Sequence, residues 1–345
     1  MTVKLYAALD VSLEKTAVCV MDQDGHITRE FEAASCPEVL AQRLSEIAPA
    51  FERIGLEAGP MSEWLLRGLA ERGMPAVLME TRQVRTALSS MRTKTDRNDA
   101  RGMAHLLRMG WFRPVHVKAV DTREQRTRLT ARDTLARRAR DLENSIRGLL
   151  RGYGLRVPRA LRGRWDAAVR QLVSGHPGLV SIFAPLLQAR TALQAQLTVL
   201  DKQVRDVART DPVCQRLMTV PGVGAIVALT SRYAVDDPTR FRSSRSVGAF
   251  FGLTPRRYQS GETDRAGATS KAGDPAGRVA LFEAAHVIMT RVTRWSTLKA
   301  WAVRVAERRG AKRAKVALAR KLAGVLHRMW MSQSDFRYVI QTTEA

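Results

Sequence analysis

The sequence predicts an α/β domain followed by mainly α-helical middle and C-terminal regions that include a coiled-coil segment. In the first 118 residues, short β-forming runs alternate with segments of helical spacing. From 119 to 210 the chain is rich in arginine and carries apolar residues at spacings of three and four. From 211 to 345 a stretch rich in glycine, serine and arginine leads into basic helices. We therefore expect three domains, 1–118, 119–210 and 211–345.

The β-forming runs of the first domain predict five strands, and the turn signal DQDG at 22–25 favours antiparallel pairing among the first of them. The predicted strands are 4–9, 16–21, 27–32, 53–58 and 75–80. The predicted helices are 37–50, 61–74 and a last one that follows Thr95, which can cap it. The order β-β-β-α-β-α-β-α predicts a mixed sheet with helices packed on it.

The middle region predicts long helices that break near 152–154 and 174–178. One of them carries an apolar seam with the a/d spacing of a coiled coil, formed by Leu186, Leu193, Leu197, Leu200, Val204 and Val207. An amphipathic helix must bury such a stripe, either against its own domain or against a second copy of the chain. The sequence leaves both possibilities open.

The last region begins at the turn formed by Asp211 and Pro212 and closes with a basic helical segment at 310–330. The expected apolar face of this segment is Val316, Leu318, Leu322, Val325 and Leu326. Upstream, VPGVG at 220–224 looks like the turn of a helix-hairpin-helix, in which Gly222 and Gly224 let backbone N–H groups approach phosphates. A plain turn between two helices explains the same glycines equally well.

Net charge is the strongest global signal in the composition. The chain has 57 Lys and Arg against 33 Asp and Glu, a formal net charge of +24 and a pI near 11.2. A polyanion would relieve this self-repulsion, so nucleic acid is the first partner to consider. A membrane surface is the rival, but no window reaches the ~18 apolar residues of a membrane span. The N-terminus also lacks a cationic stretch followed by an apolar run, so we expect a cytoplasmic protein without membrane contact.

Cysteine and histidine do not indicate a metal or disulfide framework. Cys19, Cys36 and Cys214 are too few and too scattered for either. The six histidines form no HxxH or HExxH pair.

Four carboxylates of the first domain stand where an α/β sheet gathers its ligands. Asp10 ends the first predicted strand and Glu57 ends the fourth, while Asp96 and Asp99 open the last helix. Residues three apart on a helix face the same way, with ~5–6 Å between their Cβ atoms. Strand ends and helix N-termini meet at one edge of such a sheet, so four carboxylates would share a small volume.

Two interpretations of this constellation are open. Like charges ~4 Å apart repel by about 4 kcal/mol at an effective dielectric near 20, a cost that Mg²⁺ or Mn²⁺ would remove. Oxygen ligands favour these ions over zinc. Alternatively, Asp96 and Asp99 are surface charges neutralised by Lys94, Arg97 and Arg101.

The stretch 241–278 carries hydroxyl groups among clustered cations, and RRYQSG within it reads as a polar loop. There is no GxSxG elbow and no nearby histidine, so acyl-transfer hydrolysis is not indicated. Guanidinium groups can instead hold and polarise a phosphodiester. The candidate nucleic-acid contacts here are Arg242, Arg245, Arg256, Arg257, Tyr258, Lys271 and Arg278.

The motifs LDVSLEKTAVCVMDQDG, GLEAG and KTDRNDARGMAHLLRMG resemble those of the DEDD-type insertion-sequence transposases. The resemblance implies an N-terminal domain that is RNase H-like, of the RuvC-like Holliday-junction-resolvase kind. It also implies that Asp10, Glu57, Asp96 and Asp99 form a metal-binding catalytic tetrad. Glu57 is followed by AGP where the family often has ATG, which leaves the carboxylate in place.

The C-terminal region resembles the serine transposase domain of the same family. GLTPRRYQSG at 252–261 and SKAG at 270–273 match its core, and Ser260 takes the place of the nucleophile that forms a transient phosphoserine ester with DNA. Ser270 is the main competitor for that role, whereas Ser243, Ser244 and Ser246 are expected to be phosphate or cap hydroxyls. After SKAG the chain departs from the family's pattern at Asp274, Gly277 and Val279, which puts the local packing and backbone contacts in doubt.

The resemblance implies a recombinase that moves an insertion sequence, with donor and target double-stranded DNA as partners, in a homo-oligomer such as a dimer or tetramer. The family also implies a structured bridge RNA that pairs with both DNAs, and Lys94, Arg97 and Arg101 then become phosphate contacts. One alternative is a metal-dependent junction nuclease or conventional transposase in which Ser260 is structural. A second is a non-catalytic nucleic-acid scaffold.

Overall fold

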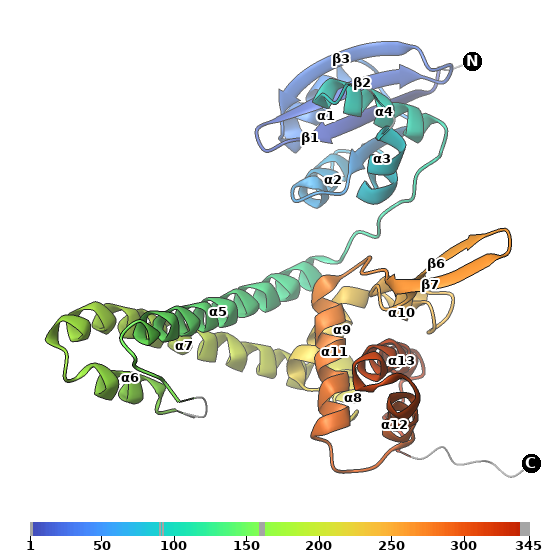
Figure 1. Cartoon of the computed structure of the whole chain (residues 1–345). Coiled ribbons are helices and arrows are strands. Elements are labelled where there is room, and N and C mark those ends of the chain that lie inside the picture. The colour runs from blue at the N-terminus through green and yellow to red at the C-terminus, as the bar shows by residue number, and fades with distance from the viewer. Residues whose placement is uncertain (1–2, 90, 92, 159–162, 339–345) are drawn as a thin grey trace, which may run out of the picture. The chain divides into compact units, whose positions relative to one another are not determined.

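Five strands of the N-terminal unit, Met1–Lys118, form one mixed sheet in the computed structural model (Figure 1). The structure describes residues 3–89, 91, 93–158 and 163–338, and a second compact unit comprises Ala119–Ala345. The strands are β1 (Leu5–Val11), β2 (Lys15–Asp22), β3 (Ile27–Ala34), β4 (Arg53–Glu57) and β5 (Ala76–Met79), in the order β3-β2-β1-β4-β5. The pairs β1–β2 and β2–β3 are antiparallel, whereas β4 is parallel to β1 and to β5, which confirms the predicted mixed sheet.

Strand alternation gives the sheet two buried faces. On one face, Ala7 and Leu9 of β1 share a core with α1 (Pro37–Ser45) and α2 (Ser62–Ala70). On the other, Ala8 packs with α3 (Thr81–Leu88) and α4 (Asp96–Arg108). Helix α3 was not predicted, because its apolar stripe is short: Val84 is its one fully buried residue, and Ala87 and Leu88 pack beside it.

The second unit begins with a long antiparallel pair of helices, α5 (Val120–Arg151) and α7 (Pro177–Thr210), joined through α6 (Trp165–Val173). Ion pairs fix the register of α5 on α7: Arg132 meets Asp201 at 2.8 Å, and Glu143 meets Arg190 at 2.7 Å. The predicted seam from Leu186 to Val207 is buried or half-buried. The apolar stripe thus packs within the chain, along α5. Its contact with a second copy stays a prediction.

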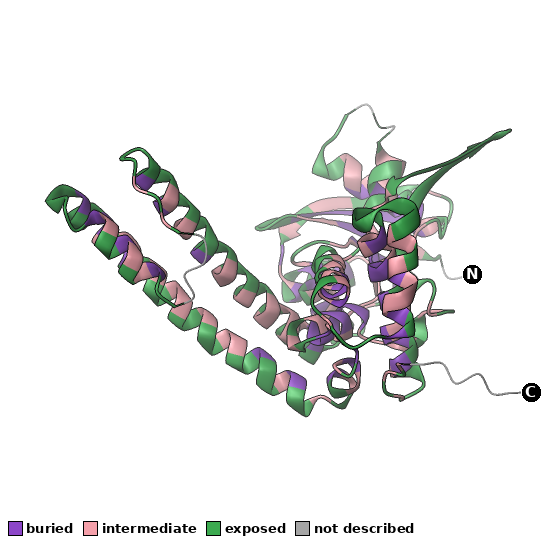
Figure 2. Cartoon of the chain, turned by 60° about the horizontal axis from the view of Figure 1, so that its bottom comes forward, coloured by how far each residue is buried: buried purple, intermediate pink, exposed green. Residues whose placement is uncertain are grey.

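The rest of the second unit is a helical bundle around α13. Its elements are α8 (Pro212–Leu217), α9 (Ala225–Val235), the 3-10 turn η1 (Pro238–Arg240), α10 (Val247–Phe250), α11 (Pro275–Thr290), α12 (Thr297–Arg309) and α13 (Ala311–Met331). The predicted apolar face of α13 is confirmed, since Leu318, Leu322 and Leu326 are buried in the core and Val316 and Val325 pack against it. In Figure 2 the buried residues of this region follow the bundle helices.

A two-stranded hairpin, β6 (Pro255–Ser260) and β7 (Thr263–Thr269), leaves the bundle between α10 and α11 (Figure 1). Nearly all of its residues are exposed (Figure 2). The expectation of a polar loop at RRYQSG was therefore wrong: these residues form β6 and its turn. Gly261 occupies the first position of the two-residue connection with φ +53°, as tight hairpins require. No helix in the described ranges is long and apolar enough to cross a membrane.

Candidate functional site

Asp10 and Glu57 lie side by side at the ends of two parallel strands. The β1–β4 register pairs Leu9 with Leu56, so Asp10 and Glu57 occupy the next step. Asp10 shares the strand face of Ala8, which packs against α4. Glu57 shares the face of Gly55, where a Cβ would come within 3.1 Å of the Leu107 side chain of α4. Both carboxylates therefore stand on the α4 side of the sheet.

The N-terminus of α4 brings the other two carboxylates to this edge. The Thr95 hydroxyl accepts a hydrogen bond from the Asn98 N–H at 3.2 Å, which confirms the predicted cap and starts the helix at Asp96. Asp96 and Asp99 then lie in the first turn, where the helix dipole favours negative charge. Further along, Ala100, Met103 and other apolar residues anchor α4 on the sheet.

The pKa of Asp10 shows that the other three carboxylates lie within electrostatic reach of it. Burial, which is the largest cause, and the negative charges of Asp96, Asp99 and Glu57 together raise the pKa of the Asp10 carboxyl to about 6. The positive charge of Lys94 opposes the rise. The structure thus brings all four predicted residues together, with one of the three predicted cations close by.

Glu57 has a mixed environment. Burial is the main cause that raises its pKa, and Asp99 adds to the rise. The positive charge of Arg85 and a hydrogen bond from the Thr81 side chain lower the same pKa. Thr81 and Arg85 belong to α3, so the helix that the sequence did not predict supplies part of the lining of this edge.

The donor set suits a hard divalent cation. All four candidate ligands are carboxylates, and nearby cations do not neutralise them fully, since the pKa of Asp10 lies well above its usual range. Among the described residues, the one group of three candidate ligands whose atoms all lie within 4.8 Å of one another is elsewhere, at Asp22, Asp24 and His26. The more open spacing of the tetrad fits mutually repelling carboxylates.

The Asp22 group is explained by a turn. The Asp22 carboxylate accepts hydrogen bonds from the backbone N–H groups of Asp24 and His26, both at 2.9 Å, in the connection from β2 to β3. A carboxylate that closes its own turn in this way needs no metal.

Two of the three basic residues around the tetrad are held by Glu30 of β3. Arg97 donates to Glu30 through Nε at 2.9 Å, and Arg101 donates through Nη2 at 2.8 Å. These hydrogen bonds lower the pKa of Glu30 to about 2. Arg97 and Arg101 therefore share one carboxylate partner within the chain. Two positive charges against one negative charge leave a net positive charge, on which their predicted phosphate contacts depend. Sequence reasoning did not single out Glu30, because nothing local links it to residues 67 and 71 positions away.

Ser260 and Ser270 lie at opposite ends of the hairpin. Ser260 ends β6 and faces Thr263 across the turn, exposed at the tip. Ser270 follows β7 at the base, where its N–H donates to the Thr254 carbonyl at 2.8 Å. Along the hairpin, Arg257 pairs with Asp264 at 2.6 Å, while Tyr258 has an exposed fraction of 58%. Arg256 is exposed as well.

The SKAG segment is tightly fitted against the residues that precede the hairpin. A Cβ at Gly273, where φ is +97°, would lie 1.8 Å from the Phe250 carbonyl oxygen. A Cβ at Gly252, where φ is +64°, would lie 2.2 Å from the Ala272 carbonyl oxygen. Lys271 between them has φ +52°, an uncommon value for a residue with a side chain. These glycines explain in physical terms why the GL and SKAG motifs occur together.

The departures from the family's pattern after SKAG have local partners. The Asp274 carboxylate caps α11 by accepting from the Gly277 N–H at 2.9 Å, and it pairs with Arg126 of α5 at 2.7 Å. Gly277 leaves room for the Phe251 ring, whose edge would meet a Cβ there at 2.2 Å. Val279 is 60% exposed, so it is free of packing constraints.

The other candidate nucleic-acid contacts have varied environments. Arg242 and Arg245 are exposed on the segment that leads into α10. Arg278 donates to the Phe251 carbonyl at 3.0 Å, which gives it a structural partner. Gly222 packs on α11, where a Cβ would meet Ile288 at 2.9 Å, whereas Gly224 opens α9 with free space around it. Close packing on α11 therefore explains the glycine at position 222 of VPGVG, as expected for a plain turn between helices. Phosphate contact by this segment stays a prediction.

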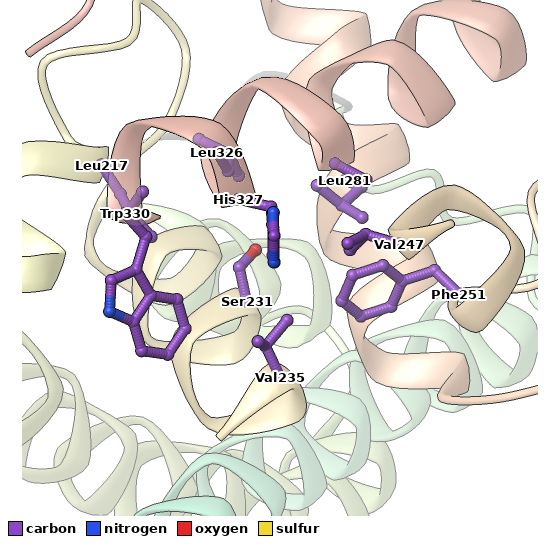
Figure 3. Close-up of a pocket in the computed structure, with 10 residues that line it drawn as sticks. Leu217, Ser231, Val235, Val247, Phe251, Leu281, Leu326, His327 and Trp330 are labelled. Atoms are coloured by element: carbon purple, nitrogen blue, oxygen red, sulfur yellow. The ribbon is translucent and has the colours of Figure 1, made fainter. Parts of the chain in front are cut away.

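A small pocket in the bundle offers no rival site. Ser231 and His327 face it in Figure 3, surrounded by apolar residues such as Leu281 and Phe251. His327 Nε2 donates to the Pro238 carbonyl at 2.9 Å, so Nδ1 can accept from the Ser244 hydroxyl at 2.9 Å. This histidine ties η1 and the segment before α10 to α13, and its polar atoms are already engaged.

The chain matches known proteins along most of its length. A family model described as "Transposase" of the DEDD IS110 type matches residues 7–155, and one described as "Transposase IS116/IS110/IS902 family" matches residues 214–301. The transposase for insertion sequence element IS1111A of Coxiella burnetii is 30% identical over 343 residues, covering 95% of this chain and 90% of that protein. The transposase for insertion sequence element IS1328 of Yersinia enterocolitica is 27% identical, covering 83% and 85%.

These matches take in both sets of candidate residues, since the first model spans the four carboxylates and the second spans the hairpin with its serines. The fold agrees with them, because a mixed α/β sheet at the N-terminus followed by helices fits a DEDD transposase. The chain belongs to the IS116/IS110/IS902 family of insertion-sequence transposases.

Proposed function

We propose that this transposase is a divalent-metal-dependent DNA recombinase that cuts and rejoins DNA through a tetrad of carboxylates and a serine nucleophile. The observation that carries the proposal is the convergence of Asp10, Glu57, Asp96 and Asp99 at one sheet edge, with the pKa of Asp10 raised to about 6. Strongly perturbed carboxylates at a ligand-binding edge are typical of functional sites. We also propose an RNase H-like, RuvC-like fold for this unit, which the strand order β3-β2-β1-β4-β5 supports.

The tetrad would hold Mg²⁺ or Mn²⁺, which supplies Lewis-acid stabilisation of charge that develops on the phosphate and on the leaving oxygen. The chain's own part is to fix the ligands. Parallel pairing of β1 with β4 sets Asp10 beside Glu57, and the Thr95 cap fixes the turn that carries Asp96 and Asp99. Lys94 lies close enough to lower the pKa of both Asp10 and Glu57, and we propose that it contacts a phosphate there.

Ser260 is the proposed nucleophile. Its oxygen forms a bond to phosphorus as the bond from phosphorus to the 3′ oxygen breaks, the serine proton passes to solvent, and the 3′ end leaves as a hydroxyl. Attack by a 3′ hydroxyl on the ester reverses the step and releases the serine, so no external energy source is needed. Exposure at the hairpin tip leaves Ser260 open to a bulky duplex. Ser270 is less open, because its backbone is tied to Thr254 at the hairpin base.

The proposal requires the tetrad and Ser260 to act on the same phosphate, within one chain or between copies. Since recombination needs four cleavages and four joinings, a dimer or tetramer is expected. We further propose donor and target double-stranded DNA and a structured bridge RNA as partners. The net charge of +24 supports binding of such polyanions, and guide pairing would supply the sequence specificity that phosphate contacts lack.

A denaturing gel with labelled donor DNA and Mg²⁺ tests the proposal. The full-length protein is expected to form a covalent protein–DNA adduct that is lost in Ser260→Ala and retained in Ser270→Ala. The double variant Asp96→Ala with Asp99→Ala, and chelation of the metal, should both abolish the adduct.

An adduct that persists in Ser260→Ala would refute the serine assignment. Cleavage without any adduct in the wild type would favour a metal-dependent junction nuclease or a conventional transposase instead. Full recombination by the Asp96→Ala, Asp99→Ala variant would indicate that the carboxylates serve no catalytic purpose.

A further inference from the structure

Helices α12 and α13, joined at Gly310, form a helical hairpin that is strongly basic (Figure 1). We call Thr297–Met331 the basic hairpin. It contains ten lysines and arginines and a single acid, Glu307. The cations are Lys299, Arg304, Arg308, Arg309, Lys312, Arg313, Lys315, Arg320, Lys321 and Arg328.

These cations lack the carboxylate partners that other arginines of the chain have. On α5, Arg132, Arg137 and Arg138 each lie within 4.0 Å of an aspartate oxygen. Across the described residues, none of the ten cations of the basic hairpin has such a contact. The charge of this element is therefore left for an external anion to neutralise.

The turn of the basic hairpin concentrates positive charge where a helix disfavours it. Arg308 and Arg309 end α12, which suits the helix dipole, but Lys312 and Arg313 occupy the first turn of α13 with no acid beside them. A cation at a helix N-terminus is unfavourable, because the helix dipole already places partial positive charge there. All four side chains are exposed, and the first turn of α13 contains no acidic residue. The phosphates of a bound nucleic-acid backbone would offset this unfavourable charge.

A second cation cluster on the same element is also unneutralised. Lys321 Nζ lies 4.4 Å from the centroid of the Trp301 ring. Burial and the charges of Arg328 and Arg304 lower the pKa of Lys321, which is the mark of like charges in mutual reach.

The chemistry of the basic hairpin favours duplex phosphates over the other polyanions. Its apolar face, with Leu318, Leu322 and Leu326, is buried in the core, so α13 cannot insert that face into a membrane surface. The rings of Trp301 and Trp330 are each covered by a cation, Lys321 and Arg232, and are not open for stacking of unpaired bases. Most of the element, from 302 onward, also lies beyond the matched family region 214–301.

We propose that the basic hairpin is a contact surface for the phosphate backbone of double-stranded DNA, centred on Arg308, Arg309, Lys312 and Arg313. Its role is to position the duplex independently of sequence, apart from the carboxylate and serine sites. The inference rests on the proposed function only in that the chain acts on DNA. Arg304, Lys321 and Arg328 extend the surface along the element.

The test compares two full-length variants that lose the same charge. One is Arg308→Gln with Arg309→Gln, Lys312→Gln and Arg313→Gln. The matched control is Lys4→Gln with Lys15→Gln, Arg137→Gln and Arg138→Gln, four exposed cations that each have a carboxylate neighbour. Binding to a 30-base-pair mixed-sequence DNA duplex is followed by fluorescence anisotropy from about 50 to 200 mM salt, the range over which phosphate contacts dominate.

Each phosphate contact contributes about 0.9 to the slope of log affinity against log salt. We expect the basic-hairpin variant to lose about 2–4 units of slope and at least tenfold in affinity at low salt, and the control to lose less than one unit. Equal losses in both variants would overturn the inference. So would a loss confined to a duplex RNA of the same length, which would assign the surface to RNA.

Adduct formation at saturating DNA separates this inference from the proposed function. The basic-hairpin variant should still form the Ser260 adduct once DNA is in excess, because the surface binds and does not react. If the wild type forms no adduct, the proposed chemistry fails while the salt slopes still decide the surface. If adducts form normally and the slopes of the two variants agree, the surface alone is refuted.

Discussion

Glu30 shows how much a single side chain contributes to the geometry of the tetrad. It ties β3 to the first two turns of α4, through Arg97 and Arg101. Its side chain has an exposed fraction of 11%, whereas that of Arg97 is 67% exposed. The pair therefore holds α4 from the solvent side, while apolar residues hold it from the sheet side.

Replacing Glu30 should destabilise the N-terminal unit in a pH-dependent way. The folded pKa of about 2 lies below the ordinary value of 4.5, so the pair's contribution is complete above pH 4.5 and is lost as pH falls toward 2. We expect Glu30→Gln to lower the free energy of unfolding by about 1 kcal/mol at pH 7, discounted for the exposed arginines. Urea unfolding at pH 7 and pH 3 measures the change.

The control for this prediction is Glu32→Gln on the same strand. Glu32 pairs with Lys15 at 3.5 Å, with both side chains more than 60% exposed, so its replacement should leave stability almost unchanged. A destabilisation by Glu30→Gln that is as large at pH 3 as at pH 7 would show that packing, and not the ion pairs, accounts for the effect.

The four carboxylates of the tetrad could be predicted from the sequence, but the residues that hold and line their site could not. Asp10, Glu57, Asp96 and Asp99 follow from strand ends and a capped helix start, which are signals within a few positions of each residue. Glu30 and the lining from α3 depend on where distant strands pair, and a single sequence carries no local trace of such contacts. The same holds for Arg126 and Asp274, which lie 148 positions apart.

At the scale of elements, the β6–β7 hairpin escaped prediction for a physical reason. Strands are recognised from the alternation of apolar and polar residues, which reflects one buried face. Both faces of this hairpin are exposed, so RRYQSG and TDRAGAT carry no alternation. Buried elements were predicted well, because burial of both faces gives β2 a continuous apolar run and burial of one face gives α13 a helical period.

The Arg126–Asp274 pair couples the α5 helix to the SKAG segment, and a double-mutant cycle can measure that coupling. Asp274→Asn keeps a capping side chain for α11 but leaves the Arg126 charge without its carboxylate partner. Arg126→Gln strands the Asp274 carboxylate, whose exposed fraction is 8%. Each single change is expected to cost about 1–2 kcal/mol, whereas the double variant should cost little more than one of them.

Urea unfolding of the full chain gives the four free energies of this cycle. Strict additivity of the two changes would show that the ion pair contributes nothing beyond its parts. The adduct assay adds a second readout: if the pair positions Lys271 and its neighbours, each single variant should lose adduct yield, and the double variant should lose little more than either of them.

At the scale of the whole molecule, the chain is built from two units with separate cores. The N-terminal unit buries both faces of its sheet, and the second unit has its own clusters in the bundle and at the α5–α7 end. The predicted regions 119–210 and 211–345 both fall in the second unit. Since all candidate metal ligands belong to the first unit, metal binding should stabilise that unit alone.

Hydrogen exchange measured by mass spectrometry on the full chain tests this expectation. A ligand that binds only the folded form stabilises it by about 1–3 kcal/mol at tens to hundreds of times its dissociation constant. Millimolar Mg²⁺ should therefore slow exchange about tenfold or more in peptides of 3–118, including β1, β4 and the start of α4, and leave 119–338 unchanged. The double variant Asp10→Asn with Asp99→Asn should lose this response. Without metal it should exchange no faster than the wild type, because removing two charges relieves the repulsion that raises the pKa of Asp10. Protection by Mg²⁺ that is equal in both units, or that persists in the double variant, would refute a metal site at the tetrad.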